Sequence, residues 1–123
     1  MKVLILIFLF FLNSINQEKQ LDVNPKKVYE SIINDSNIIL LDVRTLDEVL
    51  ENKIDNSINI DFYSEDFKKL ISNLNRDNTY YVYCRSGRRS MNTVLMMKDL
   101  GFKNSFNLEG GILKWIELNL PIK

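Results

Sequence analysis

Residues 79 to 90 read TYYVYCRSGRRS and join an apolar segment to a loop rich in arginine. The first five residues, Thr79 to Tyr83, are β-branched or aromatic and predict a central β-strand. This strand ends at Cys84, the only cysteine in the chain, and three of the five arginines follow within five residues. Positive charge elsewhere comes as eleven lysines. The loop therefore concentrates planar, fixed cations beside a single thiol.

On both sides of this stretch, short apolar segments alternate with helical ones. Asn24 with Pro25 supplies an N-cap and a first-turn proline, and Thr45 with Glu48 forms a T-x-x-E capping box. The alternation predicts an α/β fold with a mostly parallel central sheet of about five strands and helices on both faces. The predicted strands are 20–23, 37–42, 57–60, 79–83 and 104–108, and the predicted helices are 25–34, 45–51, 65–73, 90–100 and 112–118.

The loop CRSGRR, residues 84 to 89, lies between the central strand and a helix expected to begin near Ser90. In parallel sheets, ligands bind beyond the carboxyl ends of the strands, which is where Cys84 falls. A loop of this length can turn its N–H groups toward the sulfur, assisted by the helix N-terminus. Such surroundings lower the pKa of a cysteine from about 8.5 to between roughly 3.5 and 7.5. The sequence therefore predicts a nucleophilic sulfur in an anion-binding cradle.

Composition limits the classes of function. The chain has 123 residues, of which 46% are hydrophobic, and this suits one domain with a core of ordinary size. Its formal net charge is zero and no long block of like charge occurs, which argues against nucleic acid as a partner. Histidine is absent and cysteine occurs once, so neither a metal site nor a cofactor is expected.

The N-terminal segment has one lysine followed by ten unbroken apolar residues, Val3 to Leu12. Ten helical residues span about 15 Å, roughly half of a bilayer core, which favours a secretory signal peptide over a membrane-spanning helix. We expect the signal at residues 1–16, although no Ala-x-Ala marks the cleavage point. The expected location is the periplasm, without a stable membrane span after cleavage. The alternative is a membrane anchor formed by the uncleaved segment.

Five motifs resemble the rhodanese (thiosulfate sulfurtransferase) domain in order and spacing. The similarity covers about residues 20–123 and implies a single-domain rhodanese of the kind often exported in bacteria. One region departs from the family pattern, because residues 52–57 read NKIDNS where Gly-His-Ile-Pro-Gly-Ala is usual, and the conformation of this turn is left open. The motifs are LDVRT at 41–45, INI at 58–60, YCRSGRRS at 83–90, LGF at 100–102 and NLEGGILKW at 107–115, followed by LP at 120–121.

The resemblance implies a reaction and a role for each loop side chain. Cys84 would accept the sulfane sulfur of a small anionic donor such as thiosulfate and pass it to cyanide or a thiol. Arg89 would close the six-residue loop, while Arg85 and Arg88 would face the incoming anion.

Backbone and neighbouring groups complete the predicted site. The amides from Arg85 to Ser90, including those of Ser86 and Gly87, would stabilise the persulfide. Asp42 and Arg44 are expected to order the neighbouring loop through an ion pair or a hydrogen bond, and Arg44 is a candidate for the pocket mouth.

Two other functions fit parts of the pattern. Cysteine phosphatases and arsenate reductases use a Cys-x5-Arg loop, but here the sixth residue after Cys84 is Ser90 and arginine comes fifth, so the loop is one residue too short for phosphate. A rhodanese-like persulfide carrier or partner-binding module without turnover is the second alternative. The sequence does not fix the oligomeric state.

Overall fold

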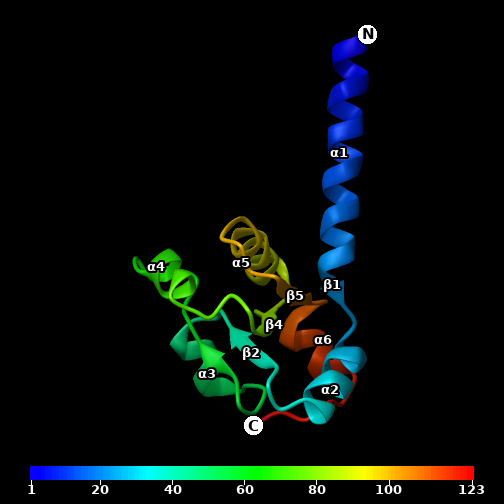
Figure 1. Ribbon diagram of the computed structural model, residues 1–123. Coiled ribbons are helices and arrows are strands. Elements are labelled where there is room, and N and C mark those ends of the chain that lie inside the picture. The colour runs from blue at the N-terminus through cyan, green and yellow to red at the C-terminus, as the bar shows by residue number, and fades with distance from the viewer.

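The computed structural model describes residues 1–123, and its five strands form one sheet (Figure 1). Every neighbouring pair of strands is parallel, and the strand order is β1-β5-β4-β2-β3. The predicted α/β architecture is therefore confirmed. The strands are β1 (Asp22–Val23), β2 (Ile39–Asp42), β3 (Ile58–Asn59), β4 (Thr79–Tyr83) and β5 (Asn104–Leu108).

Six helices accompany the sheet, and five of them match predicted segments to within a few residues. Helix α5 begins at Arg88, two residues earlier than expected, because Gly87 adopts a left-handed conformation with φ 106° at the N-cap. The helices are α1 (Lys2–Leu21), α2 (Pro25–Asn34), α3 (Leu46–Glu51), α4 (Phe67–Ser72), α5 (Arg88–Asp99) and α6 (Gly111–Glu117).

Both predicted N-caps are present. The side chain of Asn24 accepts a hydrogen bond from the Lys26 N–H at 2.9 Å, with Pro25 in the first turn. Thr45 and Glu48 form the reciprocal bonds of the capping box at the start of α3. These caps satisfy N–H groups that lack partners inside a helix and so fix where each helix begins.

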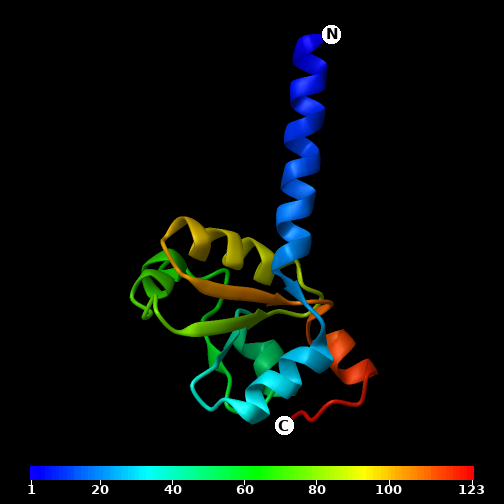
Figure 2. The same cartoon turned by 45° about the vertical axis from the view of Figure 1, so that its right-hand side comes forward.

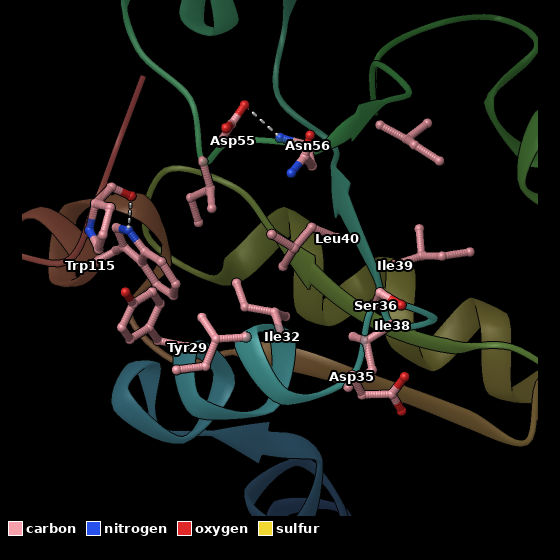
Figure 3. A pocket seen from close by; sticks show the side chains of 14 residues that line it. Tyr29, Ile32, Asp35, Ser36, Ile38, Ile39, Leu40, Asp55, Asn56 and Trp115 are labelled. Atoms are coloured by element: carbon pink, nitrogen blue, oxygen red, sulfur yellow. Dashed lines mark hydrogen bonds between the residues drawn. The ribbon is translucent and has the colours of Figure 1, made fainter.

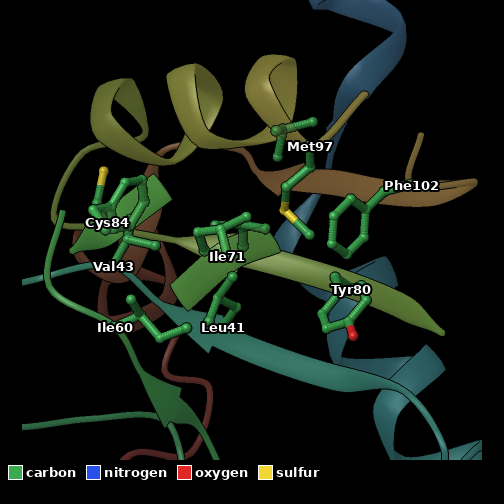
Figure 4. Close-up of a cluster of buried hydrophobic side chains, with 11 residues drawn as sticks. Leu41, Val43, Ile60, Ile71, Tyr80, Cys84, Met97 and Phe102 are labelled. Carbon is green, nitrogen blue, oxygen red and sulfur yellow. The ribbon is translucent and has the colours of Figure 1, made fainter. Parts of the chain in front are cut away.

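The sheet separates two hydrophobic clusters, with α4 and α5 on one face and α2 and α6 on the other (Figure 2). Residues of β4 alternate between the faces, because successive side chains of a strand point in opposite directions. Tyr80 and Val82 belong to the first cluster, whereas Tyr81 and Tyr83 belong to the second, as their spacing predicts. Cys84 lies at one end of the first cluster, with its sulfur directed toward the first turn of α5 (Figure 4).

Helix α1 projects from the domain and none of its residues is buried (Figures 1 and 2). Its apolar residues 3–12 are all exposed, and the helix passes directly into β1. No helix of the structure has both the length and the apolar character needed to cross a membrane.

Candidate active site at the end of β4

The thiol of Cys84 is enclosed by the loop that follows β4. The Gly87 N–H donates a hydrogen bond to the sulfur at 3.1 Å, and the Ser90 hydroxyl lies 3.3 Å from it. The residue is only 1% exposed. The loop therefore turns polar donors inward, as its glycine and length predict, but a sulfur donor must displace neighbouring side chains to reach the thiol.

Two opposing effects act on the pKa of Cys84. Burial raises it, because a thiolate is poorly solvated in the protein interior. Hydrogen bonds from the Ser90 hydroxyl and from the backbone N–H groups of Ser90, Gly87 and Ser86 stabilise the thiolate. The hydrogen bonds prevail, and the pKa lies below its ordinary value. The loop thus raises the thiolate fraction at neutral pH.

Helix α6 supports the loop from behind. The N–H of Ile112 donates to the Cys84 carbonyl at 2.9 Å, and the N–H of Leu113 donates to the Arg85 carbonyl at 3.2 Å. Gly111 has φ 64°, and a Cβ atom added to it would lie 2.7 Å from the Cys84 carbonyl oxygen. Only glycine permits this approach, so Gly111 lets α6 pack directly against the backbone of the loop.

Asn107 is a support of the loop that sequence reasoning missed. Its Nδ2 donates to the Gly87 carbonyl at 3.3 Å and to Asp22 Oδ1 at 2.8 Å. Asn107 is 3% exposed, and its Oδ1 has no hydrogen-bond partner. The sequence shows an asparagine at position 107 in a predicted strand. Which loop its side chain meets depends on the register of β5 beside β1 and β4.

The three arginines of the loop have different surroundings. Arg85 and Arg88 are exposed and form no ion pair. Arg89 donates to both carboxylate oxygens of Glu48, at 2.8 and 2.9 Å, and lies 5.6 Å from the centre of the Tyr63 ring. The sequence identified Glu48 only as a capping residue, and Tyr63 had no predicted role.

The ion pair between Arg89 and Glu48 shifts the pKa of both groups toward their charged forms. The hydrogen bond from Arg89 lowers the pKa of Glu48 to about 2, against a smaller opposing effect of burial. The same hydrogen bond raises the pKa of Arg89, which the negative charge of Cys84 raises further. Both side chains are therefore charged across the physiological range.

Asp42 and Arg44 form the predicted ion pair, and it is buried. Arg44 Nη2 lies 2.7 Å from Asp42 Oδ2, and the side chains are 3% and 1% exposed. Arg44 also donates to the carbonyls of Asn52, at 2.8 Å, and Glu48, at 3.3 Å. The pair therefore supports the segment that carries Glu48. The suggestion that Arg44 reaches a pocket mouth is wrong, because these contacts hold its guanidinium in the interior.

Two hollows lie near the sheet, and Cys84 lines neither. A mainly apolar groove of about 470 Å³ lies between α2, β2 and the turn at Asp55 and Asn56 (Figure 3), and contains no residue of the cysteine loop. A polar hollow of about 370 Å³ touches the outer side of the loop at Ser86, Gly87 and Arg88. No group of three or more His, Cys, Asp or Glu side chains is arranged to hold a metal ion.

Comparison with known proteins gives this site a context. The profile of the rhodanese-like domain matches residues 24–118. The chain belongs to the rhodanese family. The rhodanese resembles "Putative sulfurtransferase YtwF" of Bacillus subtilis, with 34% identity over 94 residues that cover 76% of this chain and 88% of the relative. It also resembles "Sulfurtransferase" of Allochromatium vinosum, with 25% identity over 101 residues that cover 82% and 92% of the two chains.

Solved structures agree with this assignment. The crystal structure of a rhodanese-related protein from Thermoplasma volcanium has a TM-score of 0.74 and 35% identity to this rhodanese, and covers 83% of this chain and 96% of its own. The five-stranded parallel sheet with helices is thus the rhodanese fold.

The turn at 52–57, which departs from the family motif, is ordered by other means. Asn56 adopts a left-handed conformation with φ 63° where the family usually has glycine. Asparagine tolerates this conformation better than most residues. The Tyr83 hydroxyl accepts a hydrogen bond from the Ile54 N–H at 3.2 Å and lies 2.7 Å from the Ser57 hydroxyl. These contacts fasten the turn to the end of the central strand.

Proposed function

We propose that this rhodanese is a sulfurtransferase that carries a sulfane sulfur as a persulfide on Cys84. The thiolate attacks the outer sulfur of an anionic donor such as thiosulfate, and the S–S bond of the donor breaks. Its electron pair leaves with sulfite, and Cys84 retains the outer sulfur as a charged persulfide. Cyanide or a thiolate then attacks that sulfur, and the electron pair of the second S–S bond returns to Cys84.

The observation that carries this proposal is the pair of donors on the sulfur, the Gly87 N–H at 3.1 Å and the Ser90 hydroxyl at 3.3 Å. The nucleophile of such a reaction is the thiolate, and donors of this kind stabilise it. Unpaired Arg85 and Arg88 provide positive charge for an anionic donor. The names of two relatives, from Bacillus subtilis and Allochromatium vinosum, point to the same chemistry.

Hydrolysis of phosphate esters fits less well. Arginine comes fifth after Cys84, and α5 already begins at Arg88, so the open part of the loop is short. Membership in the rhodanese family favours a sulfane sulfur over a tetrahedral oxyanion as the group bound there.

The test uses thiosulfate and cyanide as substrates and thiocyanate as the product measured. The wild-type protein should turn over, and Cys84→Ser should be inactive. Mass spectrometry after thiosulfate alone should find one additional sulfur on Cys84. Turnover that survives in Cys84→Ser would refute the mechanism.

Sulfur carriage for a dedicated partner is a second candidate, and the burial of the thiol supports it. With Cys84 only 1% exposed, a protein partner could open the loop more effectively than a small anion. A Bacillus subtilis relative named "Putative sulfur carrier protein YrkF" is 30% identical over 86 residues. Loading of Cys84 without thiocyanate formation in the assay would select this function.

We also propose that residues 1–16 direct export, with the rhodanese domain acting in the periplasm. The exposed apolar segment 3–12, which makes no contribution to the core, supports this role. Mass spectrometry of the protein recovered from fractionated bacterial cells tests it. A periplasmic product lacking the segment is expected. A full-length product in the membrane fraction would instead select the uncleaved anchor.

A further inference from the structure

Arg89, whose pKa Glu48 raises and the negative charge of Cys84 raises further, is paired with a carboxylate, which is unexpected beside a site that receives anions. Glu48 in α3 accepts two hydrogen bonds from Arg89 in α5, at 2.8 and 2.9 Å. The two side chains are 26% and 17% exposed, so the pair borders solvent. Tyr63 lies against the guanidinium at 5.6 Å from its ring centre and is 68% exposed.

This pairing changes what Arg89 can offer to a donor. A guanidinium binds a carboxylate or another oxyanion through the same planar pair of N–H groups. Glu48 already occupies that pair, and its negative charge opposes the positive field that Arg89 exerts on Cys84. The repulsion by Glu48 acts twice as strongly on a dianion as on a monoanion at the same distance.

We propose that Glu48 is a specificity-determining residue that disfavours small dianionic donors, thiosulfate included, relative to monoanionic donors with an aromatic or other apolar group. Tyr63 provides an exposed ring on which such a group packs. This inference rests on the sulfurtransferase function proposed above and names its donor class. A thiosulfonate satisfies the chemistry. The Cys84 thiolate attacks its outer sulfur, the S–S bond breaks, and the electron pair leaves with a sulfinate.

Glu48 also closes the capping box of α3, but this structural role can be separated from the electrostatic one. Glutamine serves equally as the third residue of a capping box, so Glu48→Gln keeps the bond to Thr45. It removes the charge, and with it one of the two hydrogen bonds from Arg89, because an amide nitrogen cannot accept. Glu51→Gln is the matched control, because it removes the same charge from an exposed position of the same helix that forms no ion pair.

The experiment measures kcat/KM for thiosulfate and for benzenethiosulfonate, with cyanide as acceptor. The ratio of the thiosulfate value to the benzenethiosulfonate value should rise about fivefold to tenfold in Glu48→Gln, as expected for removal of one unit charge near the donor. The ratio should stay within about twofold in Glu51→Gln. An unchanged or lower ratio in Glu48→Gln would overturn the inference, because a purely structural residue affects both donors alike.

Tyr63→Ala provides an independent test at an exposed position. It should lower kcat/KM for benzenethiosulfonate several-fold more than for thiosulfate, and equal losses would contradict the role of the ring.

Sulfur loading of Cys84, followed by mass spectrometry, distinguishes failure of the sulfurtransferase function from failure of the specificity assignment. If neither donor loads the wild-type protein, the sulfurtransferase function fails. If both donors load it and the ratio does not respond to Glu48, only the specificity assignment fails.

Discussion

The side-chain amide of Asn107 is hydrogen-bonded to the carbonyl of Gly87 at 3.3 Å, and the N–H of Gly87 in turn is hydrogen-bonded to the sulfur of Cys84 at 3.1 Å. Asn107 thereby restrains the left-handed residue that presents a donor to the thiol. Its own Oδ1 is buried without a partner, which ordinarily costs about 1–3 kcal/mol. Its two hydrogen bonds, to Gly87 and to Asp22, make Asn107 a positioning residue of the loop.

Replacement of Asn107 should therefore change reactivity more than stability. Asn107→Leu keeps the shape of the side chain but loses both hydrogen bonds, and it also removes the unpartnered oxygen. The free energy of unfolding should change by about 1 kcal/mol or less, while the pKa of Cys84 rises. Alkylation rates as a function of pH and denaturant titrations measure the two effects. Ser105→Ala, on the same face of β5, is the control and should leave the alkylation profile unchanged.

Ser90 should contribute directly to the ionisation of the thiol. Its hydroxyl and N–H both stabilise the thiolate, so Ser90→Ala should raise the pKa of Cys84. In the wild-type protein the alkylation rate should reach half of its maximum at a pH below the pKa of an ordinary cysteine, and the midpoint should move upward in the variant. Iodoacetamide modification across a pH series provides the measurement. An identical midpoint in both proteins would exclude a role for the hydroxyl.

The lowered thiol pKa also affects stability. Because the folded-state pKa of Cys84 lies below the unfolded value, the thiolate adds stability above the unfolded pKa, and this contribution is lost as pH falls through the folded pKa. The free energy of unfolding of the wild type relative to Cys84→Ser should therefore increase with pH between the two pKa values. Denaturant titrations at several pH values test this. A difference that decreases with pH would mean that folding raises the pKa of the thiol.

Gly111→Ala should destabilise the protein by at least about 2 kcal/mol, because it combines a left-handed conformation with a collision against the cysteine loop. Gly101 separates the two causes. It has a similar conformation, with φ 88°, but open space around the position of a Cβ atom. Gly101→Ala should therefore cost only about 1–2 kcal/mol, and thermal unfolding of the two variants would show the difference. Equal losses would mean that the loop yields to the added methyl group.

The buried pair of Asp42 and Arg44 should be far more sensitive than an exposed one. Arg44→Ala leaves a carboxylate without its partner in the interior, and we expect a loss of about 3–5 kcal/mol. The control is Lys103→Ala, which removes an ion pair to Asp77 whose side chains are 72% and 75% exposed. Such surface pairs contribute about 0–1 kcal/mol. Chemical denaturation should rank the two variants in this order.

Local signals in the sequence were sufficient for the fold. Strand alternation placed Tyr80 and Tyr81 on opposite faces, and the caps at Asn24 and Thr45 fixed two helix starts, because each depends on neighbours within four residues. The cysteine loop was predictable for the same reason. The hydrogen bond from the Gly87 N–H to the Cys84 sulfur joins residues only three positions apart.

The remainder of the site could not be predicted, since it depends on contacts between distant segments. Glu48 and Arg89 are 41 residues apart, and their pairing requires α3 to lie beside the start of α5. Asn107 and Gly87 are 20 residues apart and meet only because β5 is parallel to β4. Sequence periodicity indicates which face of a strand is buried, but it does not indicate which loop lies above a given residue.

The bond from Asn107 to Asp22 has a practical consequence for how this protein is produced. Asp22 stands at the junction of α1 and β1, only one residue beyond the helix. A recombinant version trimmed as far as Val23 would leave the amide of Asn107 without its carboxylate partner. The reactivity of Cys84 in such a product would then reflect a less restrained loop. Shortened versions intended for kinetics should therefore retain the chain from at least Gln20 onward.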